Sequence, residues 1–218
     1  MLYLNYIYRN VLECARFVGN LSVMCLYLWN RNLHNDRVLS IWIFWFSLMQ
    51  LLEFFMWRNM KNNSLFSKLA LINIFLQPFM LAAALFYYSH TFGEKIILGG
   101  IIGISFIKAV AATFYAFITQ KNKNWLSVKG PHCHLVWWFM KNSNQMPYIT
   151  RVNELFMVPL SFATLLIKPF SQGMIYFLLG FCSHTYISIF YPQERGSLWC
   201  WIAILMGVIA IRMPYFKL

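Results

Sequence analysis

Apolar runs of about 20 residues, separated by short polar stretches, recur along the whole chain. A helix needs about 20 predominantly apolar residues to cross the hydrocarbon core of a bilayer. The pattern therefore predicts an all-α fold, one polytopic transmembrane bundle of seven helices that forms a single domain over residues 1–218. The predicted spans are 10–29, 38–57, 65–88, 96–118, 148–167, 170–191 and 197–213.

One predicted connection is much longer than the others. Residues 119–147 contain four lysines and an apolar run at 135–140 that includes the pair Trp137 and Trp138. This run is too short to cross a bilayer, and tryptophan is enriched where membrane and water meet. It therefore predicts an interfacial or re-entrant piece, and long connections in compact folds are often functional.

Composition and charge agree with a membrane protein. The chain is 60% hydrophobic and only 11% charged, so it lacks the polar residues to cover a soluble surface. The net charge is +12, and most basic residues fall in loops or at the ends of apolar segments. This placement favours contact with anionic lipid headgroups over nucleic-acid binding. The larger share of Lys and Arg lies on the side of the N-terminus, which predicts a multi-pass protein with a cytoplasmic N-terminus.

Three glutamates lie inside predicted spans, namely Glu13, Glu53 and Glu154. A charged side chain inside a membrane costs roughly 2.5 kcal/mol or more, so it is usually paired or cavity-facing and often functional. Gln50 lies three residues before Glu53 and shares its helix face. Glu53 is five residues before Arg58, hence roughly 7 Å inside the span.

These groups are predicted to share one half of the bilayer. Glu53 lies near the end of the second span and Glu154 near the start of the fifth, so both fall in the same half of the bilayer. His184 lies on that side of the midplane. The functional interpretation is a polar cavity, proton relay or ion path, with the partner of Glu53 on the third or fifth span. The alternative is local pairing at i, i+3, with Glu13 paired to Arg16 and Glu154 paired to Arg151.

Lys108 lies near the middle of the fourth span, too deep to extend easily to the headgroups. It needs a polar partner from another helix, and Gln77 and Asn73 of the third span reach a comparable depth. A hydrogen-bond network or ion pair is one interpretation. A Schiff base between the lysine and an aldehyde ligand is the other.

Evidence for metal or enzyme chemistry is sparse. His132 and His134 flank Cys133 in the long connection, which suggests part of a zinc site, but no second cluster has matching spacing. The alternative is an ordinary interfacial loop. The motifs of phosphate-binding, dinucleotide-binding, serine-hydrolase and zinc-protease sites are absent. We therefore expect no cofactor and favour a protein that is not an enzyme.

Short motifs resemble a known group of membrane proteins. The run LMQLLEFFMW at 48–57, Gln77-Pro78, and the run CHLVWW at 133–138 are similar to motifs of small multi-span proteins of unknown function from large DNA viruses and protists. The resemblance covers the chain from about residue 20. It implies a seven-span bundle, transfers no activity, and marks Gln50, Glu53, Gln77, Pro78, His134 and Trp137.

The functional hypothesis is a small channel or transporter for protons or ions. Its predicted pathway groups are Glu53, Glu154 and Gln50. Lys108 and Gln77 are predicted to lie at the midplane, and His184 is predicted to act as a relay. Alternatives are a receptor-like protein that binds a lipid or other apolar ligand, a structural membrane protein, and an integral membrane enzyme. The sequence leaves homo-oligomerisation open.

Overall fold

The structure, a computed structural model, describes residues 2–33, 35–88, 91–131, 134–152, 154–200 and 202–212, and over these ranges it is nearly all-α, as predicted. Five helices are long and apolar enough to cross a membrane, and they correspond to five predicted spans. They are α1 (Leu2–Arg31), α2 (Asp36–Arg58), α3 (Ser64–Tyr88), α4 (Phe92–Phe114) with a π-helical extension η1 (Tyr115–Thr119), and α7 (Phe170–Phe190). These helices fit a membrane-embedded protein.

The other two predicted spans are shorter helices. Within 148–167 the structure has α6 (Glu154–Leu165), of 12 residues, and within 197–213 it has α9 (Ile202–Arg212), of 11 residues, preceded by α8 (Arg195–Cys200). At 1.5 Å per residue, α6 and α9 are about 16–18 Å long, whereas the hydrocarbon core is roughly 30 Å thick. The predicted count of seven spans is therefore not confirmed.

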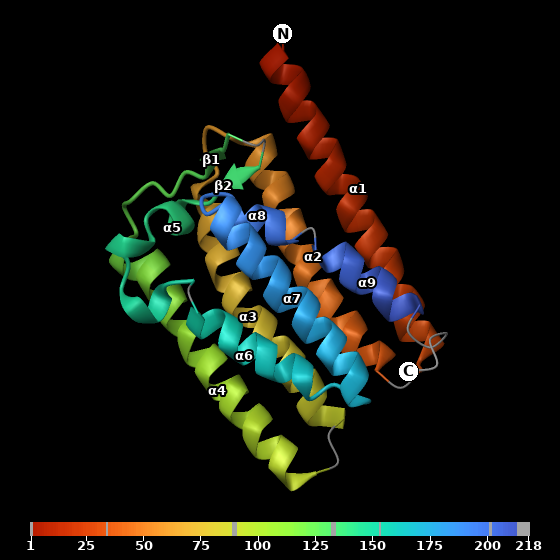
Figure 1. Ribbon diagram of the computed structural model, residues 1–218. Helices are drawn as coiled ribbons and strands as arrows, with labels where there is room; N and C mark the ends of the chain where they lie inside the picture. Colours follow the sequence, from red (N-terminus) through yellow and green to blue (C-terminus); the bar gives the residue numbers. More distant parts are fainter. Residues whose placement is uncertain are drawn as a thin grey trace.

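Helices α1 and α2 form an antiparallel hairpin at one edge of the bundle (Figure 1). The turn between them contains Asn32, whose φ of 53° ends α1 in the left-handed conformation that asparagine tolerates. The Ser40 hydroxyl of α2 donates to the Cys25 carbonyl of α1 at 2.8 Å. One face of α1 is buried at a spacing of three or four residues, through Cys14, Phe17, Leu21, Cys25 and Leu28.

Helices α2 and α3 are also antiparallel, and they share the apolar core. Asn73 of α3 donates from Nδ2 to the Trp45 carbonyl at 3.4 Å and lies 3.5 Å from the Met49 sulfur. Helix α6 packs on α3, while α7 approaches α2 where the rings of Trp42 and Tyr176 meet edge to face. This packing leaves α1 and α4 at the periphery of the bundle (Figure 1).

The long connection is folded against the end of the bundle. It contains an antiparallel pair, β1 (Val128–Lys129) and β2 (Leu135–Val136), then α5 (Trp138–Lys141) and η2 (Ser143–Gln145). The turn η3 (Tyr148–Thr150) follows it, where the fifth span was predicted to begin. Asn63 holds the connection by two 2.9 Å hydrogen bonds with the backbone of Ser127. Three large apolar side chains are fully buried within it, namely Trp125, Trp137 and Phe139.

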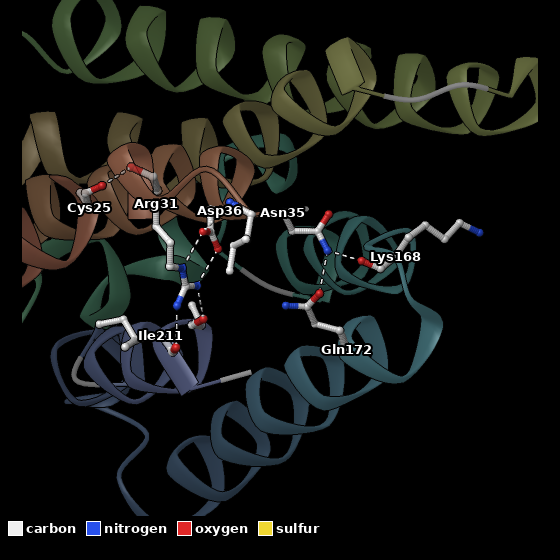
Figure 2. A network of polar contacts seen from close by, with 10 residues as sticks. Cys25, Arg31, Asn35, Asp36, Lys168, Gln172 and Ile211 are labelled. Atoms are coloured by element: carbon white, nitrogen blue, oxygen red, sulfur yellow. Dashed lines mark hydrogen bonds and ion pairs between the residues drawn. The ribbon is translucent and has the colours of Figure 1, made fainter. Parts of the chain in front are cut away.

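A polar cluster ties the helices together at the opposite end of the bundle (Figure 2). Arg31 donates from Nε and Nη2 to both oxygens of Asp36, each at 2.7 Å, and from Nη1 and Nη2 to the carbonyls of Ile211 and Ala210. One side chain thus joins α1, α2 and the last turn of α9. Nearby, the Asn35 amide donates to the Lys168 carbonyl and to Gln172 Oε1, which attaches the hairpin to the α6–α7 turn.

Candidate functional site

Glu53 is the centre of the candidate site. Its side chain is 1% exposed, although it lies on a helix long enough to cross a membrane. Oε1 accepts a 3.0 Å hydrogen bond from Trp137 Nε1, and Oε2 accepts a 3.1 Å hydrogen bond from the Ser197 hydroxyl. Both donors are neutral, and no ion pair joins this carboxylate to a described residue. The sequence predicted a partner on the third or fifth span, which was wrong.

Local structure explains why these donors reach Glu53. Trp137 lies between β2 and α5 in an extended conformation that turns its indole inward, and its ring lies directly against the backbone of Gly196. A Cβ atom at position 196 would overlap the Trp137 ring, so glycine is needed there. Ser197 follows in α8. The connection and α8 therefore close the bundle over Glu53 from two directions.

Two buried amides lie deeper in the bundle than Glu53. Gln50 lies one turn before Glu53 on α2, and Gln77 belongs to α3. The side chain of each is 1% exposed. Neither the oxygen nor the nitrogen of either amide has a hydrogen-bond partner. The contact between Asn73 and Trp45 sets the register of the two helices and places Gln77 near the depth of Trp42. Trp42 Nε1 is also buried without a hydrogen-bond partner.

Uncharged polar groups thus occupy successive depths of the interior. Trp42 is 11 residues before Glu53 on α2, a separation of about 16 Å along the helix axis. Buried amides without protein partners are commonly satisfied by ordered water or a bound ion. The arrangement provides hydrogen-bonding groups from one half of the bundle to the other.

A small pocket opens beside Trp42, between α2, α6, α7 and α9. Tyr176, Phe177, Leu160 and Met206 form most of its apolar wall. Gly180 of α7 also lines it, where a side chain would narrow the space between α7 and Met206. This pocket is separate from Lys108, so it does not provide the aldehyde site that was one interpretation of that lysine.

Lys108 is buried by a different part of the chain. Its Nζ donates to the Ile149 carbonyl of η3 at 3.0 Å and lies 4.9 Å from the centre of the Phe75 ring. The partner is therefore a backbone carbonyl of η3, at the start of the predicted fifth span, and neither Gln77 nor Asn73 contributes. Lys108 is 11 residues before Thr119, roughly 16 Å along the helix. The turn η3 thus packs beside α4, while the interfacial or re-entrant piece predicted at 135–140 stays a prediction.

Because Lys108 has no carboxylate partner among the described residues, replacing it should leave no buried carboxylate without an opposite charge. We expect Lys108→Met to lower the free energy of unfolding by less than about 2 kcal/mol, the scale of one hydrogen bond from a charged donor. Methionine keeps the length of the apolar stem against Phe75. Detergent-induced unfolding followed by circular dichroism measures the change. A loss of about 3–5 kcal/mol would instead indicate a buried ion pair.

The remaining predicted residues are not brought to Glu53. His184 is half-buried on α7, and neither hydrogen bond of Glu53 goes to it. Glu154 begins α6, but its side chain lies outside the described residues, so its role stays a prediction. Arg151 donates to the carbonyls of Met146 and Asn144. Arg16 is exposed, and among the described residues no ion pair joins its side chain to that of Glu13.

The metal hypothesis also stays a prediction. His132 and Cys133 lie outside the described residues, and His134 is half-buried at the start of β2. Across the part of the chain that the structure describes, no group of three or more His, Cys, Asp or Glu side chains is arranged to hold a metal ion.

Sequence reasoning missed Ser197 as a partner of Glu53 and missed the Arg31 cluster. For Ser197 the only local signal is the preceding glycine, which is too common to be specific. For Arg31 a signal exists, because opposite charges five residues apart flank the turn between two predicted spans. Trp137 was named in the predicted interfacial run 135–140 and marked by the resemblance, but it was not predicted as a partner of Glu53.

Comparison of the chain with family models, curated proteins and solved structures finds no match. The resemblance to multi-span proteins of large DNA viruses and protists therefore stays a prediction. Function has to be argued from the geometry alone.

Proposed function

We propose that the protein conducts protons or small cations across a membrane through the interior of its helical bundle, with Glu53 as the group that binds the transported ion. One observation carries the proposal: a carboxylate buried inside a membrane-length helix is held by two neutral donors. Buried charges are usually paired with an opposite charge. A carboxylate without such a partner is suited to gaining and losing a proton or a cation.

The neighbouring groups support a route rather than an isolated residue. Gln50 and Gln77 offer donors and acceptors that no described residue uses, Gln50 one turn from Glu53 and Gln77 near the depth of Trp42. Proton relays and ion paths in membranes are built from such interior polar side chains. We assign Lys108 to holding η3 against α4, because its amine already bonds a carbonyl there. Glu154 and His184 remain proposed members of the route.

Orientation and lipid contact belong to the same proposal. We place the N-terminal side of α1 in the cytoplasm, following the distribution of Lys and Arg. Lys61, Lys121 and Lys123 are exposed on that side and suit anionic headgroups. In this arrangement α6 and α9 enter the membrane as short segments, which would complete seven membrane-embedded segments.

Flux measurements on reconstituted protein test the proposal. In liposomes with an internal pH dye and an imposed potential, wild type should acidify the lumen faster than protein-free vesicles do. Glu53→Gln should lower that flux by roughly tenfold or more, because the amide keeps the shape of the side chain but cannot exchange a proton.

The matched control is Glu94→Gln. Glu94 is a partly buried carboxylate at the start of α4 that pairs with Lys168, away from the interior route. Its variant should match wild type. Equal loss of flux in both variants, or wild-type flux no greater than that of empty vesicles across a series of pH and cation conditions, would overturn the proposal.

The pocket between α2, α6, α7 and α9 favours a second candidate function, the binding of an apolar ligand. Its wall is apolar, while the rings of Trp42 and Tyr176 carry polar groups that are buried and without hydrogen-bond partners. An apolar lining with few polar groups is typical of small-molecule sites. Absence of flux in wild type would promote this candidate.

A further inference from the structure

The outer face of α1 carries polar residues where a lipid-facing helix should be apolar. The inner face packs on the bundle through Phe17, Leu21 and Leu28. The opposite face exposes Arg16, Asn20, Val23 and Tyr27, at the spacing of three and four residues that lines one side of a helix. Helix α1 lies at the edge of the bundle, so no other part of the described chain covers this face (Figure 1).

Asn20 lies at the middle of the membrane-spanning length. The hydrogen bond between Ser40 and Cys25 sets the register of the α1–α2 hairpin. Asn20 is five residues from Cys25, about 7 Å along α1, and so reaches the depth of residue 45, near the centre of α2. Its side chain is exposed and forms no hydrogen bond with any described residue. The Asn20 stem is too short to reach the headgroups, whereas the long Arg16 side chain can extend toward them.

We propose that this outer face of α1 forms the interface of a homodimer. Two copies inserted with the same orientation place their α1 helices in parallel, so each residue meets its counterpart at the same depth. An amide group both donates and accepts, so two Asn20 side chains satisfy each other across the twofold axis. Asparagine at such a position joins membrane helices and fixes their register.

The residues around Asn20 allow the close approach that this contact needs. Gly19 has no atom within 4 Å of where its Cβ would lie, so the neighbouring surface is free for another helix. Small residues let membrane helices approach closely. Val23 is 67% exposed one turn further on and would pack against its own copy. Repulsion between two Arg16 guanidinium groups is limited if both extend to the headgroups.

A competing surface exists on α4, where Gly99 and Gly103 also meet no atom within 4 Å. The two glycines form a GxxxG spacing, which permits close contact between membrane helices, and no described residue packs against them. It contains only small and apolar residues, so lipid can cover it without an unsatisfied polar group. Asn20 therefore favours α1, and the α4 surface becomes an outcome of the test.

Energy transfer between labelled copies in liposomes measures the dimer at decreasing protein-to-lipid ratio. We expect wild type to dimerise and Asn20→Leu to raise the dissociation constant about tenfold, the scale of one interhelical hydrogen bond in a membrane. Asn20→Gln should retain part of the affinity. Thr185→Val, which removes an exposed hydroxyl from α7, is the matched control and should not change it.

Cysteine cross-linking gives an independent readout. The chain has five cysteines, so the test uses a background in which all five are replaced. Val23→Cys should form an intermolecular disulfide readily, whereas Val110→Cys, 52% exposed on α4, should not. A monomeric wild type would overturn the proposal. So would a dimer that survives Asn20→Leu but is lost in Gly99→Ile.

Discussion

Replacing Arg31 with methionine should destabilise the bundle by about 3–5 kcal/mol, because it strands a buried carboxylate. Asp36 is 3% exposed, and both of its oxygens accept from Arg31 (Figure 2). Among the described residues, the only other hydrogen bond to this carboxylate comes from the backbone N–H of Leu33, which does not carry a full charge. The same substitution removes the donors to Ile211 and Ala210, so the last carbonyls of α9 lose their partner.

Lys168→Met is the matched control for this prediction. Lys168 also forms an ion pair, at 3.1 Å with Glu94, but its side chain is 59% exposed. Exposed pairs contribute about 1 kcal/mol or less, so this variant should unfold close to wild type. Detergent-induced unfolding followed by circular dichroism compares the two.

A second variant distinguishes the effect of the unpaired Asp36 carboxylate from the effect of lost packing around Arg31. Adding Asp36→Asn to Arg31→Met should recover part of the stability, because it removes the unpaired charge. Equal stability of the Arg31 and Lys168 variants would show that the cluster does not hold α9 in place.

The positions of the long helices could be predicted from the sequence, while the short ones could not. The run 38–57 became α2 (Asp36–Arg58), because charged residues bound it on both sides. The run 65–88 became α3 (Ser64–Tyr88), because the polar stretches 61–64 and 89–91 bound it. Hydropathy does not report backbone conformation. In 148–167 an apolar run includes the 3₁₀ turn η3 and the extended residues before α6, so its length overstates the helix.

The candidate site was predictable in its burial but not in its partners. Glu53 is costly against lipid and was expected to face the interior, and it is buried. Its hydrogen bonds reach Trp137 and Ser197, which are 84 and 144 residues away in sequence. Trp137 lies outside every predicted span, and Ser197 is the first residue of the last one, so helical periodicity gave no reason to pair either with Glu53. Contacts of this kind depend on how a long connection folds back, and local patterns carry no information about that.

Replacing Trp137 should be the most disruptive change at the candidate site. Trp137→Ala removes a fully buried indole, and substitutions of this type cost about 3–5 kcal/mol. It also removes a donor to Glu53 and the ring against which Gly196 packs. We therefore expect the connection and α8 to detach from the end of the bundle, measured as a lower unfolding midpoint and faster proteolysis within 120–147.

Trp137→Phe separates the hydrogen bond from the packing, and the chain offers a matched control. Trp125 is also fully buried in the connection, but its Nε1 has no hydrogen-bond partner. Both substitutions lose similar volume, so the hydrogen bond should make Trp137→Phe the more destabilising by about 1–2 kcal/mol. A double-mutant cycle with Glu53→Gln should give a coupling energy of at least about 0.5 kcal/mol for Trp137 and near zero for Trp125. If the two couplings are equal, the indole of Trp137 acts only through packing, and Glu53 is held without it.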